Sequence, residues 1–123
     1  NLGIAFQMID DMLDYTSCEE EFGKPVGKDL REGKITLPLI YALSELEDKE
    51  TERLQVLFRT QDVDAGEYDR LIETVRKYRT IERVRSEAME YSAKAASCLE
   101  GFDPSTEKEQ LLDLNEYLVT RAF

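Results

Sequence analysis

The amino-acid sequence predicts an all-α protein, and three observations lead to that fold class. Apolar residues recur at the i, i+3 and i+4 spacing of one helix face through most of the 123 residues. No stretch shows the alternation of apolar and polar residues that is typical of a half-buried strand. Most of the glycines and prolines fall at the ends of the periodic segments, where they interrupt or end helices. We therefore expect about six helices and no sheet.

Composition limits what this chain can do. At 123 residues it is large enough to bury a core, and it corresponds to one domain or to part of one. The net charge of −11 without a basic stripe argues against nucleic-acid binding, which depends on Lys and Arg contacts to phosphates. The absence of histidine excludes the usual zinc sites and histidine-dependent acid–base or triad catalysis within the chain.

Cysteine usage and hydropathy predict the compartment. Cys18 and Cys98 form no CxxC pair, so we expect buried or unreactive thiols in a reducing environment. No apolar run is long enough for a transmembrane helix and no signal peptide is present, so we expect a soluble, cytoplasmic protein. The first residues after Asn1 already have a mid-helix pattern, which suggests a fragment of a longer protein.

The first predicted helix, residues 2–17, separates its polar and apolar side chains. On a helical projection, one arc of roughly 100° contains Gly3, Gln7, Asp10, Asp11 and Asp14. The opposite side is covered by the apolar residues Ile4, Ala5, Met8, Ile9, Met12 and Leu13. We therefore expect most of this helix to be buried.

The three carboxylates of this arc repel one another, each like-charged i,i+4 pair costing on the order of a few tenths of a kcal/mol. They also lie far from the helix start, where the macrodipole would favour anions. Local helix energetics gives no reason for them, whereas a hard divalent cation would. Mg²⁺ takes one or two carboxylates, keeps several waters and completes its coordination with phosphate oxygens. Asp10 and Asp14, about 6 Å apart along the axis, suit one hydrated Mg²⁺ site.

A solvated acidic helix face and an EF-hand calcium loop are two alternatives to a magnesium site in this arc. The first stays open on these residues alone, because the chain is 35% charged. The second is excluded. If Asp10 is the first loop position, Met12 occupies the third, where a ligand is needed, and Tyr15 the sixth, where a glycine is needed.

Residues 19–33 lose all periodicity and are predicted to form a loop, since they contain Gly23, Pro25, Gly27 and Gly33. Loops longer than about 12–15 residues are uncommon in compact domains and tend to be functional. The loop and its end bring four cations into an acidic chain: Lys24, Lys28, Arg31 and Lys34. This reversal of charge directly after the acidic helix is the second informative feature. We interpret the run Glu19-Glu20-Glu21 as a solvated loop edge.

Helical periodicity resumes near Thr36, which is suited to cap a helix that has Pro38 in its first turn. A break is expected around residues 48–51, within a run of charges, and a turn follows in which Asp64 and Glu67 have capping-box spacing. The predicted core-facing residues of these segments are Leu39, Ile40, Leu43, Leu46, Leu54, Leu57, Phe58, Tyr68, Leu71, Ile72, Val75 and Tyr78.

Two further helices complete the chain. Thr80 is predicted to cap the first, whose alanines and serines indicate close helix–helix contact, and Gly101 to end it. Asp103 and Pro104 are predicted to open the last helix as N-cap and first helical residue. The predicted core residues are Ile81, Val84, Ala88, Tyr91, Ala95 and Leu99 in the first helix, and Leu111, Leu114, Tyr117 and Leu118 in the last.

Three motifs at their observed spacing carry a family resemblance. The acidic helix contains Gly3-x-x-Phe6-Gln7-x-x-Asp10-Asp11-x-x-Asp14. The loop continues as Gly23-Lys24-Pro25-x-Gly27-Lys28-Asp29-x-x-x-Gly33-Lys34-x-Thr36-Leu37-Pro38, and the tail contains Tyr117-Leu118-Val119-x-Arg121. Together they resemble the second aspartate-rich motif, the lysine-bearing loop and the C-terminal helix of the trans-type isoprenyl (polyprenyl) diphosphate synthases.

The resemblance implies that residues 1–123 are the C-terminal fragment of a single isoprenoid synthase domain, a helical bundle around a deep cavity. In that family two aspartate-rich motifs face each other across Mg²⁺ ions that bind an allylic diphosphate. The allylic diphosphate ionises to a cation and pyrophosphate, and the double bond of isopentenyl diphosphate attacks the cation. Metals and lysines stabilise the charge on the leaving group, so histidine is not required.

The resemblance also implies roles for the residues of the first motif. Asp10 resembles the direct Mg²⁺ ligand, and Asp11 and Asp14 would act on the same metal mainly through bound water. Gln7 matches the glutamine near the allylic cation, where its carbonyl dipole would help.

For the second motif, Lys24 and Lys34 match the lysines that contact the allylic diphosphate, a task that suits a compact charge on a flexible stem. Asp29 would orient Lys34 or the loop. Lys28 and Arg31 are better explained as solvated loop charges.

Parts of the family pattern do not occur in this chain, namely the first aspartate-rich motif and the basic residues that bind isopentenyl diphosphate. We therefore expect the 123-residue fragment to be inactive by itself. For the full-length enzyme of the family that the chain resembles, we expect a homodimer. Apolar surface left exposed by truncation should lead the fragment to self-associate or to pack differently around residues 1–18.

Two other functions compete with that of a catalytic synthase. One is a non-catalytic subunit of a heteromeric prenyl synthase, which the intact aspartates and lysines argue against. The other is a terpene cyclase of the same fold, whose usual Asn/Ser/Glu triad is absent. As to the product, residues 36–40 are more similar to those of medium- and long-chain synthases, such as octaprenyl or heptaprenyl types, than to bacterial farnesyl synthases.

Overall fold

The computed structural model describes residues 1–16 and 27–120, and every regular element within those ranges is a helix. The all-α prediction is confirmed. The helices are α1 (Leu2–Thr16), α3 (Lys28–Arg31), α4 (Leu37–Ser44), α5 (Asp48–Thr60), α6 (Ala65–Lys77), α7 (Thr80–Ser97) and α8 (Thr106–Thr120). The short helix α3 lies inside the stretch predicted to be a loop, so that part of the prediction was wrong.

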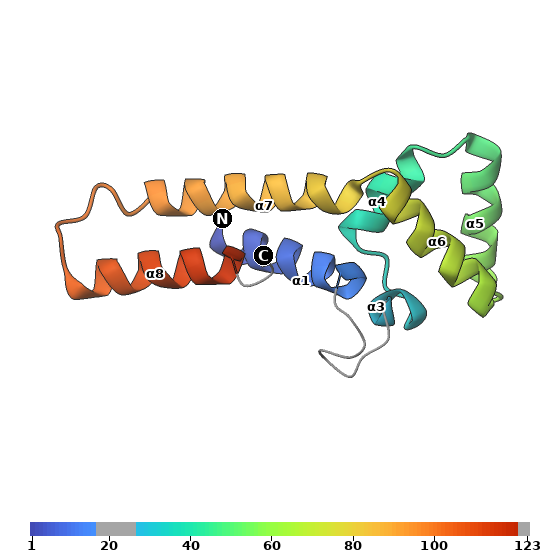
Figure 1. The fold of residues 1–123 in the computed structure, drawn as a ribbon, viewed down its shortest axis with the longest axis horizontal. Coiled ribbons are helices and arrows are strands. Elements are labelled where there is room, and N and C mark those ends of the chain that lie inside the picture. The colour runs from blue at the N-terminus through green and yellow to red at the C-terminus, as the bar shows by residue number, and fades with distance from the viewer. Residues whose placement is uncertain (17–26, 121–123) are drawn as a thin grey trace.

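Helices α1, α7 and α8 lie side by side and form the elongated part of the molecule (Figure 1). α1 packs against both α7 and α8, and these two also contact each other. Helices α3 to α6 gather at the other end, where α4 contacts α1, α6 and α7. α1 therefore belongs to both parts of the fold.

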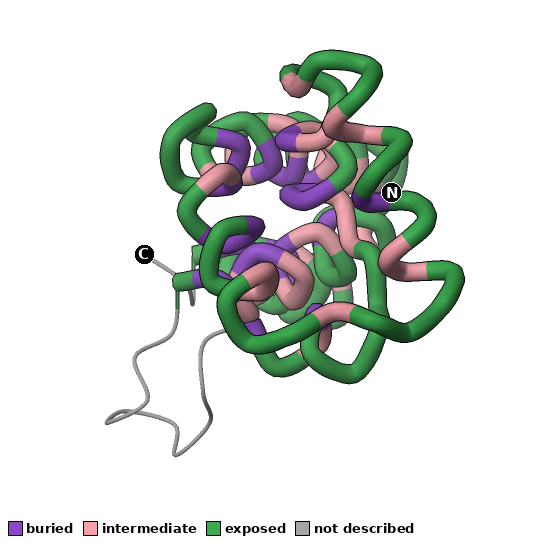
Figure 2. The backbone as a smooth tube through the Cα atoms, turned by 90° about the vertical axis from the view of Figure 1, so that its right-hand side faces the viewer, coloured by how far each residue is buried: buried purple, intermediate pink, exposed green. Residues whose placement is uncertain are grey.

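Two clusters of buried apolar side chains hold the helices together. In Figure 2 the buried positions, in purple, lie where the helices face one another. The first cluster joins α1, α7 and α8 through Ala5, Ile9, Met12, Val84, Ala88 and Val119. The second joins the last turn of α1 to α3, α4, α5 and α6 through Tyr15, Leu30, Leu39, Ala42, Leu54, Leu71, Ile72 and Val75. The i, i+4, i+7 spacing on α1 is the spacing that places side chains on one helix face.

The starts of α4 and α5 differ in detail from those predicted. Thr36 precedes α4 in an extended conformation, but its side chain makes no capping hydrogen bond; Pro38 does lie in the first turn. The break falls at residues 45–47, because α5 already begins at Asp48. Asp48 and Glu50 occupy the first turn of α5, where the helix dipole favours anions.

Asp64 caps α6 as predicted, since its Oδ1 accepts a hydrogen bond from the Glu67 backbone N–H at 2.8 Å. Thr80 does not cap α7. The N-cap is Arg79, in the left-handed conformation with φ 53°, and the buried Thr80 hydroxyl donates to the Val75 carbonyl at 3.3 Å. The sequence does not predict this turn, because glycine or asparagine, rather than arginine, usually occupies the left-handed conformation.

The boundaries between α7 and α8 also differ. α7 ends at Ser97, before Gly101, and α8 begins at Thr106. Ser105, rather than Asp103, supplies the cap, because its Oγ accepts a hydrogen bond from the Lys108 backbone N–H at 3.1 Å.

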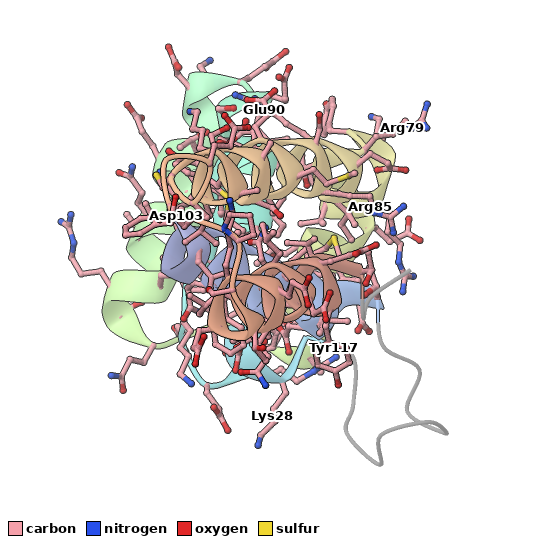
Figure 3. The ribbon with its side chains drawn as sticks, turned by 90° about the vertical axis from the view of Figure 1, so that its left-hand side faces the viewer. Lys28, Arg79, Arg85, Glu90, Asp103 and Tyr117 are labelled. Carbon is pink, nitrogen blue, oxygen red and sulfur yellow. The ribbon has the colours of Figure 1, made fainter. Side chains whose placement is uncertain are left out.

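The inward face of α8 is not the one predicted. Leu111, Leu114 and Tyr117 are 46%, 46% and 64% exposed, whereas Asn115 and Val119 are buried. Tyr117 lies at the surface of the molecule in Figure 3. The Asn115 side-chain amide donates to the Ser92 carbonyl of α7 at 3.0 Å. Since α8 packs chiefly against α7 and α1, it buries a narrow stripe and leaves Leu111 and Leu114 on the open side.

The structure bears on two of the expectations about the compartment. Within residues 1–16 and 27–120, no helix is long and apolar enough to span a bilayer. Cys98 is an exposed free thiol, so burial does not hold for this cysteine; Cys18 lies outside the described residues.

Truncation of a buried leucine should distinguish the core from the open face of α8. We expect Leu39→Ala, which opens a cavity at a fully buried position, to lower the free energy of unfolding of the 123-residue chain by about 2–5 kcal/mol. Leu111→Ala is the matched control and, at a concentration at which the chain is monomeric, should change it by less than about 0.5 kcal/mol. Urea denaturation followed by circular dichroism measures both. Equal losses would contradict the observed orientation of α8.

Candidate functional site

Helix α1 carries the predicted polar residues on one side. Gln7 is exposed and the three aspartates are half-buried, while Ala5, Ile9, Met12 and Tyr15 are buried on the other side. The predicted separation is therefore confirmed for the middle of the helix. It fails at Ile4, which is 47% exposed because neither buried cluster extends to it.

Asp11 is held by a neighbour on its own helix and by the start of α4. Gln7 Nε2 donates a hydrogen bond to Asp11 Oδ1 at 2.8 Å. Burial raises the pKa of Asp11 above its usual 3.8, and repulsion from Asp29 and Asp10 adds to the rise. The hydrogen bond from Gln7 and the backbone N–H of Leu37 lower the pKa and partly offset the burial. An ionised Asp11 is thus costly without a nearby cation.

Asp14 connects α1 to residues 27–34, the cationic segment. Its Oδ1 accepts a hydrogen bond from the Asp29 backbone N–H at 3.1 Å, and its backbone carbonyl accepts one from the Gly27 N–H at 2.8 Å. Oδ2 is buried without a well-formed hydrogen bond, although the N–H groups of Lys28 and Leu30 help to stabilise the carboxylate. Burial raises the pKa of Asp14, and the Asp29 N–H acts against that rise.

The cationic segment, residues 27–34, is shaped by two glycines in the left-handed region. Gly27 has φ +76° and Gly33 has φ +86°. A Cβ on Gly27 would also lie 2.8 Å from Ile72 Cδ1, so this position requires glycine for both conformation and space. Lys34 follows directly, and its Nζ lies 3.6 Å from Asp29 Oδ1 and 3.6 Å from Glu32 Oε2.

The remaining cations of this segment pair with surface acids. Lys28 Nζ lies 3.7 Å from Glu32 Oε1, and the Lys28 side chain extends outward (Figure 3). Arg31 donates to Asp69 Oδ1 at 3.2 Å and lies over the Tyr68 ring, 5.5 Å from its centroid. These contacts agree with the interpretation of both residues as loop charges at the surface.

The structure brings some predicted site residues together and leaves others apart. Asp14 and the segment containing Lys34 meet through Asp29, whereas Lys24 lies outside the described residues. Among the described residues no group of three acidic, histidine or cysteine side chains is placed to hold a metal ion.

Sequence reasoning missed two hydroxyls beside the carboxylates. Tyr15 is 2% exposed, and its hydroxyl and that of Thr36 are buried without well-formed hydrogen bonds. Burial raises the pKa of Tyr15, and the charge of Asp14 adds to the rise. The helical spacing of Tyr15 indicates only a core aromatic, and no sequence signal links it to Thr36.

Comparison with known proteins identifies the family. The sequence model of the family described as "Polyprenyl synthetase" matches residues 1–75, more than half of the chain. The chain belongs to the polyprenyl synthetase family. It is 36% identical over its whole length to a protein named "Prenyl transferase" from Cyanophora paradoxa. It is 34% identical over 99% of its length to "Heptaprenyl diphosphate synthase component 2" from Geobacillus stearothermophilus.

Solved polyprenyl synthases share the fold. The crystal structure of a polyprenyl synthase from Caulobacter crescentus superposes with a TM-score of 0.82 at 32% identity over 99% of this chain. This chain spans 36–37% of the length of these three proteins. The similarity supports the predicted assignment to the isoprenoid synthase helical bundle, of which the chain covers a C-terminal region.

The raised pKa of Asp11 predicts a stabilising substitution. Between the usual pKa of 3.8 and the higher pKa in the folded state, the folded chain binds more protons than the unfolded chain, so stability falls as pH rises through this window. Asp11→Asn removes the loss of stability that comes from ionising this partly buried carboxyl group. We expect a higher Tm than the parent at pH 7 and a difference that vanishes below pH 3.8. Thermal unfolding across pH measures it.

Asp113→Asn, at an exposed position on α8, is the control and should leave Tm close to that of the parent. A Tm for Asp11→Asn that is lower than the parent value at pH 7 would contradict the prediction.

Proposed function

We propose that this chain is part of a polyprenyl diphosphate synthase that condenses an allylic diphosphate with isopentenyl diphosphate and releases pyrophosphate. The observation that carries the proposal is the hydrogen bond from the Asp29 N–H to Asp14, because it joins the acidic arc of α1 to the segment that bears Lys34. Relatives named as polyprenyl, hexaprenyl and heptaprenyl synthases support it.

The residues of α1 fit a hard divalent cation. We infer that Asp10 binds Mg²⁺ directly and that Asp11 acts through bound water, since carboxylate oxygens are the ligands that Mg²⁺ prefers. The burial of Asp11 supports this, because a nearby cation would offset its repulsion from Asp10 and Asp29. The Caulobacter synthase is described as complexed with calcium and isoprenyl diphosphate, which supports the use of a divalent ion. The contacts of Asp14, the third carboxylate, favour a different task.

Bound Mg²⁺ would supply positive charge against the departing diphosphate. Lys34 would donate hydrogen bonds to the diphosphate oxygens, and Lys24 is proposed for the same contact. The Lys34 side chain is 62% exposed, and its pairs with Asp29 and Glu32 are surface pairs that exchange readily. Gln7 uses its amide N–H for Asp11, so its carbonyl oxygen remains available to face the allylic cation.

The oligomeric state and the chain length of the product are inferred from the family and from the names of similar proteins. We infer a homodimer for the full-length enzyme; the "component 2" name of a similar protein makes a heteromeric synthase the alternative. The aspartates of the motif are intact, which favours a catalytic chain over a non-catalytic subunit. The similar proteins named above are prenyl synthases rather than terpene cyclases, and hexaprenyl and heptaprenyl products support a medium- or long-chain enzyme.

The cytoplasmic location remains a prediction. Among the relatives, the hexaprenyl synthase of Neurospora crassa is named mitochondrial, and the solanesyl diphosphate synthase 1 of Arabidopsis thaliana is named chloroplastic. Fractionation of cells that express the tagged full-length protein distinguishes these compartments.

Binding of a bisphosphonate is the direct test of the site. We expect Mg²⁺-dependent binding to the 123-residue chain by isothermal titration calorimetry, and its loss in Asp10→Ala. Glu90→Ala, an exposed acid on α7 (Figure 3), is the matched control and should bind as the parent does. Binding that is independent of Mg²⁺, or unchanged in Asp10→Ala, would contradict the proposal. The same preparation should form no prenyl product from radiolabelled isopentenyl diphosphate.

The open face of α8 predicts self-association of the isolated chain. Leu111, Leu114 and Tyr117 are exposed together on one helix, and exposed apolar patches tend to find partners. We expect sedimentation equilibrium to show dimers or larger species, and Leu111→Lys with Leu114→Lys to shift them toward monomer. A monomeric parent that binds no hydrophobic dye would contradict this.

A further inference from the structure

The two carboxylate oxygens of Asp14 lie against the protein, one in a hydrogen bond and the other buried. Oδ1 accepts the hydrogen bond from the Asp29 N–H at 3.1 Å, and Oδ2 is fully buried. A carboxylate can hold a metal through a bound water only if one of its oxygens faces the solvent or the substrate. Oδ2 is not placed in that way, and Oδ1 already accepts a hydrogen bond from the protein, although the motif pairs Asp14 with Asp10 and Asp11.

Helix α3 needs a cap from elsewhere in the chain. It has only four residues, and its N-cap, Gly27, has no side chain to accept a hydrogen bond from the first N–H groups. The Asp14 carboxylate supplies the missing acceptor at the Asp29 N–H, as an N-cap side chain would. The Asp14 backbone carbonyl also holds the Gly27 N–H, so one residue of α1 fixes the start of the segment twice.

The same residue of α3 then holds Lys34. The Asp29 carbonyl accepts a hydrogen bond from the Lys34 backbone N–H at 2.8 Å, and Asp29 Oδ1 lies 3.6 Å from Lys34 Nζ. Asp29 therefore links α1 to Lys34. Its N–H contacts Asp14, and its carbonyl and carboxylate contact Lys34.

We infer that Asp14 is a positioning residue that caps α3 from α1 and thereby sets where Lys34 lies relative to Asp10, rather than a residue that holds the metal. The assignment of diphosphate to Lys34 and Mg²⁺ to Asp10 rests on the proposed function. The capping role itself rests only on the contacts of Asp14.

The test compares Asp14→Asn with Asp14→Ala in the full-length protein. Asparagine keeps an oxygen that accepts the Asp29 N–H and caps helices about as well as aspartate, whereas alanine cannot. We expect Asp14→Ala to speed amide hydrogen exchange in a peptide spanning residues 27–34 about tenfold and to weaken pyrophosphate binding at saturating Mg²⁺ by a similar factor. Asp14→Asn should stay within about twofold of the parent in both measurements.

The Mg²⁺ concentration at half-saturation separates positioning from metal binding. It should be unchanged in Asp14→Asn and raised in Asp10→Asn, which should leave exchange at residues 27–34 at the parent rate. Amide hydrogen exchange in α7 peptides reports whether the Asp14→Ala protein is folded. If it is not folded, the Mg²⁺ requirement of Asp14→Asn alone decides between positioning and metal binding. The inference is overturned if Asp14→Asn raises the Mg²⁺ requirement as much as Asp10→Asn does, or if folded Asp14→Ala leaves exchange at residues 27–34 unchanged. An unchanged Mg²⁺ requirement in Asp10→Asn would overturn the proposed metal role, while exchange would still decide the role of Asp14.

Discussion

A carboxylate in the last turn of a helix gains nothing from the dipole of that helix, and this fold stabilises Asp14 with the first amides of another helix. The Asp29 N–H meets Asp14 Oδ1, and in the inferred role of Asp14 this contact sets the position of α3. Asp11 has a related arrangement, because the Leu37 N–H at the start of α4 stabilises it. Two of the three aspartates of α1 are therefore stabilised where neighbouring helices begin, at the edge of the site.

This arrangement has a consequence for the chemistry. The segment that bears Lys34 is anchored to α1 through its backbone, while the lysine side chain stays exposed. In the proposed function, the ammonium group of Lys34 on this fixed backbone would follow a diphosphate as charge develops on the leaving group, without movement of the helices. Gly27 contributes to the same rigidity, because its close approach to Ile72 joins the start of α3 to the core cluster of α6.

The apolar surface of α8 fits a chain that spans about a third of the length of the synthases it resembles. In residues 1–16 and 27–120, α8 is covered on the side of α7 and α1 and open elsewhere. The acids of α1 are half-buried, and among the described residues no group of three such side chains is placed to hold a metal ion. The proposed self-association would cover the open face of α8.

The sequence by itself determined the all-α class, the polar arc of α1, the cap at Asp64 and the identity of the charged residues, because these follow from helical period and local chemistry. It did not determine α3, the cap by Ser105 or the buried face of α8. Leu111 and Val119 both suit a core by composition, and only the placement of α7 and α1 decided which was buried. The role of Asp14 was decided in the same way, since its hydrogen-bond donor lies fifteen residues away in the chain. Such a contact depends on how α1 and α3 pack together, and no local pattern encodes it.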